Sequence, residues 1–161
     1  NKRYLVERAT QFLADARNHP AWVVVVDLDH FKSINDRHGH ITGDRVLQAV
    51  GALFRGFFRE GDVIARSGGE EFVLLLKGRS RDQCLEEVEH LRRRLETLRP
   101  EGLELTASIG LATNMDRAGT GYETILDEAD RAMYRAKELG RNCVVLAGSD
   151  TPVHAGKFAR E

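Results

Sequence analysis

The sequence lacks several features that define common classes of protein. It has only two cysteines, Cys84 and Cys143, in 161 residues, and their wide separation argues against a zinc site or a disulfide framework. No apolar run approaches the ~20 residues that a membrane-spanning helix needs. The 24 basic and 25 acidic residues nearly cancel, so the overall charge is not that of a nucleic-acid-binding protein. We therefore expect two ordinary thiols in a reducing compartment, no nucleic-acid partner and no membrane contact by this domain.

What is present fits one globular domain. Hydrophobic residues make up 42% of the chain and charged residues 30%, and this length is enough for one core but not for two ordinary domains. The chain begins at Asn1, without the regions of a signal peptide, so we expect a domain taken from a longer protein. The domain is predicted to span residues 1–148, and the polar residues 149–161 are predicted to form a loose tail.

Helical and strand periodicities alternate along the chain. Apolar residues at helical spacing predict helices over residues 4–18, about 45–57, 85–98 and 122–139, with a short helix and a loop between 30 and 40. Runs rich in β-branched or alternating apolar residues predict strands over residues 21–29, 62–67, 70–76, 103–113 and 142–148. Two of these strands are joined by Gly68-Gly69, a pair typical of a tight hairpin. A hairpin beside helix-connected strands predicts an α/β or α+β fold, with a mixed central β-sheet surrounded by helices.

Acidic side chains stand where two of the predicted strands meet solvent. Asp27 and Asp29 end the buried run "AWVVVVDLD", and Glu70 and Glu71 stand at the hairpin tip. Acids beside a buried strand are costly unless they are exposed or meet a positive charge. Carboxylate oxygens are suitable ligands for Mg²⁺ or Mn²⁺, so this edge of the sheet is a candidate metal site. Simple solvation of carboxylates at strand ends is the alternative.

Cationic side chains mark a candidate phosphate site. The short helix after Asp29 would have free N–H groups that can hold a phosphate, and Lys32 would add charge in its first turn. Lys137 and Arg141 lie four residues apart at the end of the last helix, where both can reach one phosphate. The alternative is structural, because the helix dipole favours cations at any helix C-terminus.

Four blocks of sequence occur in order along nearly the whole chain, from about residue 4 to residue 145. They are "DLDHFKSINDRHGHITGD", "RSGGEEF", "LTASIGLAT" and "DEADRAMYRAKELGRNCV". Together they resemble the GGDEF-domain diguanylate cyclases, in the GGEEF variant. The resemblance implies a fold similar to the palm domain of nucleotide cyclases and polymerases. It also implies an enzyme that joins two GTP molecules into cyclic di-GMP with release of two pyrophosphates, acting as a homodimer because one domain holds one GTP.

The resemblance assigns roles to the acidic side chains and to the glycines. Asp27 and Glu70 would be metal ligands, helped by the backbone carbonyl of Leu28, and Glu71 would be a further ligand or a proton acceptor. These three acids are the implied catalytic residues, acting with two Mg²⁺ or Mn²⁺ ions. The Gly68-Gly69 pair would let the backbone approach the nucleotide where any Cβ would collide.

Asn35 and Asp44 match the positions that read guanine in this family. An ionised carboxylate only accepts hydrogen bonds, and guanine offers adjacent N–H donors that adenine lacks, so Asp44 is suited to select GTP. Without the resemblance, an N-cap on a helix beginning near Arg45 would be the preferred interpretation of Asp44. The other implied substrate-binding positions are Lys32, Lys137 and Arg141 for the phosphates, together with His40 and Phe31, although Phe31 is expected to pack in the core.

An RxxD pattern precedes the hairpin. It consists of Arg59 and Asp62, with five residues between Asp62 and Gly68, which matches the spacing of the family's inhibitory product site. An arginine fork can grip the phosphate and guanine of cyclic di-GMP, with Asp62 accepting from the base. A surface Arg–Asp pair is the alternative.

Two other functions stay open from the sequence. The first is a binding module that senses GTP or binds cyclic di-GMP through Arg59 and Asp62. The second is a cyclase that closes a single nucleotide on itself. Relatives usually begin with a stretch like D-x-L-T-G-L-x-N-R, and this chain starts at the position of its Asn, so a fused N-terminal regulatory or sensor region is expected. The resemblance also implies a location in the bacterial cytoplasm.

Overall fold

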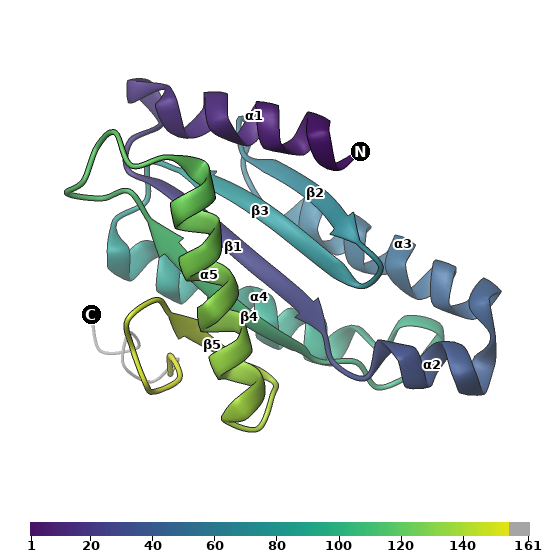
Figure 1. Cartoon of the computed structure of the whole chain (residues 1–161). Helices are drawn as coiled ribbons and strands as arrows, with labels where there is room; N and C mark the ends of the chain where they lie inside the picture. Colours follow the sequence, from purple (N-terminus) through teal and green to yellow (C-terminus); the bar gives the residue numbers. More distant parts are fainter. Residues whose placement is uncertain (155–161) are drawn as a thin grey trace.

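The computed structural model describes residues 1–154, which form one five-stranded sheet with helices on both faces (Figure 1). The strands are Ala21–Leu28 (β1), Val63–Gly68 (β2), Glu71–Lys77 (β3), Ala107–Thr113 (β4) and Cys143–Leu146 (β5). Their order across the sheet is β2-β3-β1-β4-β5. Every neighbouring pair is antiparallel except β4 and β5, which are parallel. The predicted mixed central sheet is therefore confirmed.

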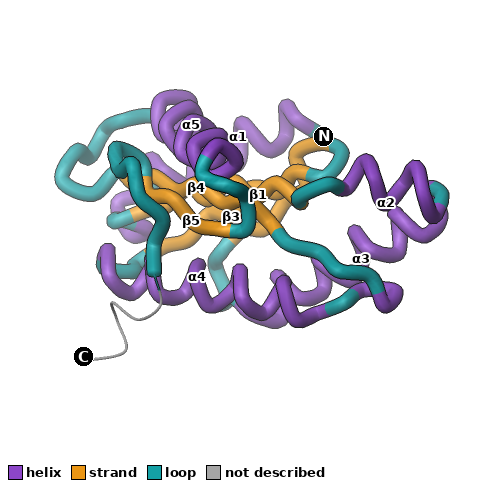
Figure 2. Tube along the Cα trace, turned by 90° about the horizontal axis from the view of Figure 1, so that it is seen from below, coloured by secondary structure: helices purple, strands orange, loops and turns teal. Residues whose placement is uncertain are grey.

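The helices divide between the two faces of the sheet. They are Lys2–Ala14 (α1), Phe31–His38 (α2), His40–Phe57 (α3), Arg81–Leu98 (α4) and Tyr122–Glu138 (α5), with short 3₁₀ turns at Ala16–Asn18 and Pro100–Gly102. Helices α1 and α5 cover one face, and α3 and α4 cover the other, so that the sheet lies between two helical layers (Figure 2). Helix α2 lies beside α3, beyond the end of β1 (Figure 1).

Strand β1 lies at the centre of the molecule, and all eight of its residues are buried. Trp22, Val24 and Val26 pack in the cluster that includes α3 and α4. Val23 and Val25 point to the opposite face and pack with residues of α1 and α5. Successive side chains of a strand alternate between faces, so a strand buried on both faces needs the continuous apolar run seen here. The same alternation places Asp27 on the face of α5.

Helix α5 approaches the sheet closely at Gly110 in β4. A Cβ at this position would lie 2.1 Å from the backbone nitrogen of Met133 and 2.2 Å from the carbonyl oxygen of Ala129. Only a glycine fits, because these atoms belong to the helix backbone and not to a movable side chain. Gly110 therefore fixes the distance between α5 and the sheet.

Two local predictions are wrong at the ends of helices. The first helix ends at Ala14, and a separate 3₁₀ turn follows it, because the backbone of Asp15 is extended and its side chain caps the turn. The predicted loop before the third helix is absent within the described residues. Gly39, with φ +87°, is the single residue between α2 and α3. Since α3 begins at His40, Asp44 lies inside the helix and is not its N-cap.

Residues of the predicted tail up to Val153 make contacts with the domain. The backbone N–H of Val153 donates to the carbonyl of Val144 at 2.7 Å, and the Val153 side chain packs against the core. Residues 155–161 of the predicted tail lie outside the described residues. Across residues 1–154, no helix is both long enough and apolar enough to span a membrane.

Candidate active site

The acidic side chains of β1 and β3 meet at one edge of the sheet. Asp27 and Glu71 are directly opposite each other in the antiparallel ladder, so both side chains point to the face that carries α5. Beside them, the backbone N–H of Leu28 donates to the carbonyl of Glu70 at 3.1 Å. The ladder thus brings together the end of β1 and the hairpin tip, which lie more than 40 residues apart in the sequence.

Helix α5 adds a positive charge to this edge. The Nζ atom of Lys137 lies 3.0 Å from Oδ2 of Asp27. It also lies 5.5 Å from the centre of the Tyr134 ring, a cation–π contact. Sequence reasoning had treated Lys137 as a phosphate-binding residue and had not foreseen its contact with Asp27.

The site shifts the pKa values of two of its carboxyl groups. Burial raises the pKa of Asp27, the contact with Lys137 partly opposes this, and the nearby charge of Glu70 adds to it. Burial also raises the pKa of Glu71, and the charges of Asp130 and Asp27 raise it further. A carboxyl group with a raised pKa is a better proton acceptor once it is ionised.

Asp130 is a site residue that the sequence analysis missed. Its charge acts on Glu71, and it lies on α5 seven residues before Lys137. Seven residues are about two helical turns, so both side chains lie on the same side of the helix. That spacing was visible in the stretch "DEADRAMYRAKELG" and was the signal for Asp130.

Asp29 anchors the turn after α5, and its charge also acts on Asp27. Its carboxylate accepts hydrogen bonds from Thr106 Oγ1 and Ser108 Oγ, both at 2.7 Å, and from the backbone N–H of Asn142 at 3.1 Å. Asn142 and the preceding Arg141 both have positive φ, 48° and 66°, which is unusual for residues other than glycine. Asp29 therefore holds the strained backbone from which the Arg141 side chain extends into solvent.

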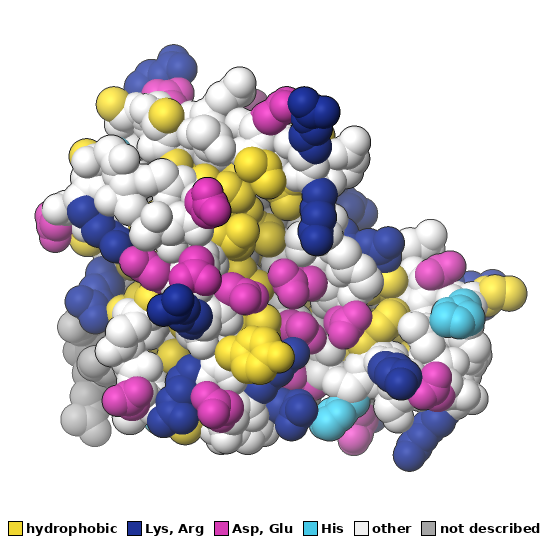
Figure 3. All heavy atoms as spheres, in the orientation of Figure 1, with side chains coloured by type: hydrophobic (Ala, Val, Ile, Leu, Met, Phe, Trp, Pro, Cys, Tyr) yellow, Lys and Arg dark blue, Asp and Glu magenta, His cyan; other side chains and the backbone are white. Residues whose placement is uncertain are grey.

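A cavity of about 1120 Å³ opens at this edge, between α1, α5 and the hairpin tip. Figure 3 shows acidic side chains gathered across the middle of this face, next to apolar surface. The lining includes the three predicted catalytic acids and the two glycines of the tip, with basic residues of α1 and further acids of α5: Asp27, Gly68, Gly69, Glu70, Glu71, Lys2, Arg3, Glu123, Asp127 and Asp130.

The hairpin tip is open on the side of the two glycines. Gly69 has φ +35°, whereas Gly68 does not have a positive φ, and a Cβ at either position would meet no atom within 4 Å. The register of β2 against β3 shifts between Arg66 and Gly68, a local irregularity that redirects the tip. The space that a nucleotide would need beside these glycines is therefore free.

The donor set at this edge fits a divalent cation. Mg²⁺ usually takes one or two carboxylates from a protein and completes its shell with water and substrate phosphates. Asp27 and Glu70 supply carboxylates, and the carbonyl of Leu28 lies on the same backbone segment. Among residues 1–154, no group of three or more His, Cys, Asp or Glu side chains is arranged to hold a metal ion by itself.

The two predicted guanine-reading residues lie on neighbouring helices. Asn35 is on α2, and a Cβ placed on Gly43 of α3 would lie 1.8 Å from its Oδ1. The Asn35 amide therefore rests on the turn of α3 that carries Asp44, whose side chain is exposed. Gly43 makes this approach possible, and sequence reasoning had not singled it out.

The remaining predicted substrate-binding residues differ in exposure. Lys32 and His40 are exposed on α2 and at the start of α3. Phe31 is only 5% exposed and packs in the core cluster of α3 and α4. Phe31 therefore packs in the core, as the sequence predicted.

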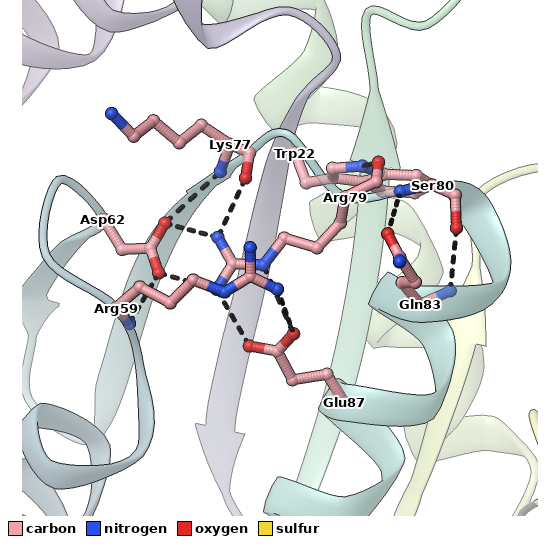
Figure 4. Close-up of polar contacts among 8 residues, drawn as sticks. All are labelled: Trp22, Arg59, Asp62, Lys77, Arg79, Ser80, Gln83 and Glu87. Carbon is pink, nitrogen blue, oxygen red and sulfur yellow. Dashed lines mark hydrogen bonds and ion pairs between the residues drawn. The ribbon is translucent and has the colours of Figure 1, made fainter.

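The RxxD pair lies at the opposite end of the hairpin. Arg59 is exposed in the turn before β2, whereas the Asp62 carboxylate is buried and hydrogen-bonded to Arg79 (Figure 4). Strand β3 runs from Glu71 at the tip to Lys77 beside Asp62. At 3.3 Å per residue the two ends are about 20 Å apart.

Comparison with known families decides the relationship of the chain. A family model described as "Diguanylate cyclase, GGDEF domain" matches residues 1–143. The chain belongs to this GGDEF-domain family. It is 34% identical over 151 residues to the diguanylate cyclase DosC of Escherichia coli, covering 91% of this chain and 33% of DosC. It is 38% identical over 156 residues to the diguanylate cyclase DgcP of Pseudomonas aeruginosa, covering 91% of this chain and 22% of DgcP.

Solved GGDEF structures agree with the fold. The GGDEF domain of YfiN (TpbB) from Pseudomonas aeruginosa is 34% identical, with a TM-score of 0.83 over 92% of this chain and 96% of that one. The GGDEF domain of DgcB from Caulobacter crescentus, solved in complex with c-di-GMP, is 28% identical, with a TM-score of 0.82 over 92% and 91% of the two chains. The present GGDEF chain thus matches whole solved domains but spans one third or less of the curated relatives.

Proposed function

We propose that the chain is the catalytic domain of a diguanylate cyclase, which joins two GTP molecules into cyclic di-GMP and releases two pyrophosphates. The observation that carries this proposal is the pairing of Asp27 with Glu71 across β1 and β3, beside Glu70 and within the cavity at the hairpin tip. Membership of the GGDEF family supports the same activity.

Asp27, Glu70 and the carbonyl of Leu28 would hold Mg²⁺ or Mn²⁺. Bound there, such ions would neutralise phosphate charge and lower the pKa of the attacking 3′-hydroxyl. Glu71, whose pKa burial raises, would be a further ligand or the acceptor of that proton. Lys137 lies beside Asp27 and, with Arg141 and Lys32, supplies positive charge for the triphosphate.

Asn35 and Asp44 would select guanine. Asp44 is exposed on α3 and can only accept hydrogen bonds when ionised, which suits the N–H donors of guanine. Asn35 lies against the same turn. The exposed His40 at the start of α3 is close to this group in the sequence. The base-binding part of the proposed site would then lie on α2 and α3, and the phosphate-binding part would lie between α2, α5 and the sheet edge.

The proposed reaction needs two domains, because each site holds one GTP. We therefore propose an antiparallel homodimer, in which the rate rises more steeply than in proportion to protein concentration. We also propose product inhibition at the surface around Arg59, a fused N-terminal regulatory or sensor region, and a cytoplasmic location, where GTP is present.

The experiment is to incubate the chain at high concentration with GTP and Mg²⁺ and to identify the product by mass spectrometry. Glu70→Ala removes a proposed metal ligand, and Glu86→Ala, an exposed glutamate of α4, is the matched control. We expect cyclic di-GMP from the parent and from Glu86→Ala, and none from Glu70→Ala. A cyclic mononucleotide would identify the single-nucleotide cyclase instead. No product, even with dimerisation forced by a fused coiled coil, would replace the proposal with a GTP- or cyclic di-GMP-binding module.

A further inference from the structure

An arginine of α4 contacts the turn formed by Arg141 and Asn142, which leads from α5 into β5. Helix α4 lies on the face of the sheet opposite α5 (Figure 2). The Arg92 side chain of α4 is only 13% exposed. Its Nη1 atom donates to Oδ1 of Asn142 at 2.7 Å, and its Nε atom donates to the carboxylate of the buried Glu89. One guanidinium thus joins α4 to a turn 50 residues further along the chain.

The side-chain amide of Asn142 is held at both of its polar atoms. Oδ1 accepts from Arg92, and Nδ2 donates to Oε2 of Glu96, which lies on α4 four residues after Arg92. If the amide were turned over, its NH₂ group would face the guanidinium and its oxygen would face the carboxylate, so both hydrogen bonds would be lost. Arg92 and Glu96 also form an ion pair at 3.8 Å. Helix α4 therefore fixes both the position and the orientation of the Asn142 side chain.

The backbone of Asn142 connects α4 with the end of β1. Its N–H donates to Oδ2 of Asp29 at 3.1 Å, and Asp29 lies two residues after the proposed metal ligand Asp27. The Asn142 residue thus has one hydrogen bond toward the site and two toward α4. A change in α4 at Arg92 would therefore reach the site through Asn142.

The backbone of Arg141 depends on this support. Both Arg141 and Asn142 have positive φ, a conformation that asparagine adopts more readily than arginine. Residues held in such a conformation persist where the surrounding contacts determine it. The N–H of Arg141 donates to the carbonyl of Ala136 at 3.0 Å, and the contacts of Asn142 hold the other side of the turn. These contacts set the direction in which the exposed Arg141 side chain leaves the backbone.

We propose that Arg92 is a positioning residue of the candidate active site: by holding Asn142, it keeps the turn in the conformation from which Arg141 binds the triphosphate. The inference rests on the proposed function, in which Arg141 supplies positive charge to the phosphates of GTP. The role needs an arginine, because a guanidinium donates in several fixed directions at once, whereas a lysine ammonium is a compact charge on a flexible stem. Arg92 acts through Asn142 and does not itself contact the substrate.

The test is a double-mutant cycle between Arg92 and Arg141, measured by calorimetric titration with a non-hydrolysable GTP analogue and Mg²⁺. Arg92→Lys keeps a positive charge beside Glu89 but cannot also hold Asn142 with a second donor group. Arg141→Ala removes the proposed phosphate contact, and the double variant combines both changes. Arg93→Lys, at an exposed arginine next along α4, is the matched control for the replacement of arginine by lysine.

Glu96→Ala tests the same turn without changing Arg92. The Glu96 side chain is 44% exposed, so its removal leaves the core intact, but the Nδ2 atom of Asn142 loses its acceptor. The melting temperature of every variant is measured first, and the titrations are made well below the lowest of them. Weaker binding then reports on the site and not on a partly unfolded sample.

We expect Arg92→Lys and Glu96→Ala each to bind the analogue roughly 3- to 10-fold more weakly, because part of a charge-assisted hydrogen bond to phosphate is lost. Arg93→Lys should bind it with parental affinity. When Arg141 is already alanine, Arg92→Lys should change the affinity by less than about twofold, because both changes remove the same contact.

Two results would overturn the inference while leaving the phosphate role of Arg141 intact. One is parental affinity in Arg92→Lys, and the other is an equal loss of affinity with and without Arg141, which would show that Arg92 supports the fold alone. If Arg141→Ala itself binds the analogue with parental affinity, Arg141 does not bind the phosphates, and the inference fails with that assignment. The cyclase activity is tested separately by Glu70→Ala.

Discussion

The contact between Gly43 and Asn35 gives a way to disturb base recognition without touching either proposed base-reading side chain. In Gly43→Ala the new Cβ would lie 1.8 Å from Asn35 Oδ1 and 3.0 Å from its Cγ. Since non-bonded heavy atoms separate to about 3.5 Å, the amide oxygen must move by about 1.7 Å. The obstacle is the end of a side chain, so Asn35 can rotate away and the helix can stay folded.

The displaced amide could no longer make its proposed hydrogen bond to guanine. A neutral hydrogen bond contributes about 0.5–1.5 kcal/mol, so we expect GTP to bind roughly 2- to 10-fold more weakly. Binding of ATP, which lacks the guanine edge, should change less than twofold, about the error of such a comparison. The assay is calorimetric titration with non-hydrolysable analogues of GTP and ATP in the presence of Mg²⁺.

Gly56→Ala is the matched control in the same helix. A Cβ there would meet no atom within 4 Å, and both substitutions gain up to about 1 kcal/mol of helix propensity. The control should therefore be at least as stable as the parent and bind GTP unchanged. If Gly43→Ala also binds GTP with parental affinity, Asn35 does not recognise the base and its assignment fails.

Two further predictions concern stability and the phosphate side of the site. Gly110→Ala would force α5 away from β4, and since overpacking against backbone costs about 3 kcal/mol, we expect the melting temperature to fall by roughly 10 °C; a melting temperature within a degree or two of Gly56→Ala would contradict the close approach. Asp29→Asn leaves one of the three donors at Asp29 unsatisfied, so we expect a loss of about 1–3 kcal/mol in the free energy of unfolding. Because the turn bearing Arg141 loosens with it, GTP should also bind more weakly; a destabilised variant with parental GTP affinity would show that this turn does not bind the phosphates.

The sequence predicted those parts of the molecule that depend on local pattern. The apolar run of β1 and the hairpin around Gly68-Gly69 could be predicted, because buried strands and tight turns depend on residues that are neighbours in the sequence. The meeting of Asp27 with the hairpin tip followed from where the strands end. The sequence left an N-cap open as the role of Asp44, because the third helix was expected to begin near residue 45. The true connection is Gly39 alone, and a link of one residue is too short to be recognised from composition.

Contacts between distant residues were beyond prediction. Arginine is rarely fully buried, so nothing in the sequence around Arg79 indicated that it would be 0% exposed between Asp62 and Glu87. The hydrogen bond from Asn142 to Asp29 joins residues 113 positions apart. These partners are brought together by the packing of α4 and α5 on the sheet. A short stretch of sequence carries no information about that packing.

Helix α5 connects the packing of the core with the chemistry of the proposed site. Its backbone at Met133 fits against Gly110, and Lys137, four residues or about one turn further on, meets Asp27. Asp130, about one turn before Met133, raises the pKa of Glu71. A shift of α5 at Gly110 would therefore move Lys137 and Asp130 together relative to Asp27 and Glu71, the two proposed catalytic acids. The absence of a Cβ at Gly110 thus affects the electrostatics at the end of β1.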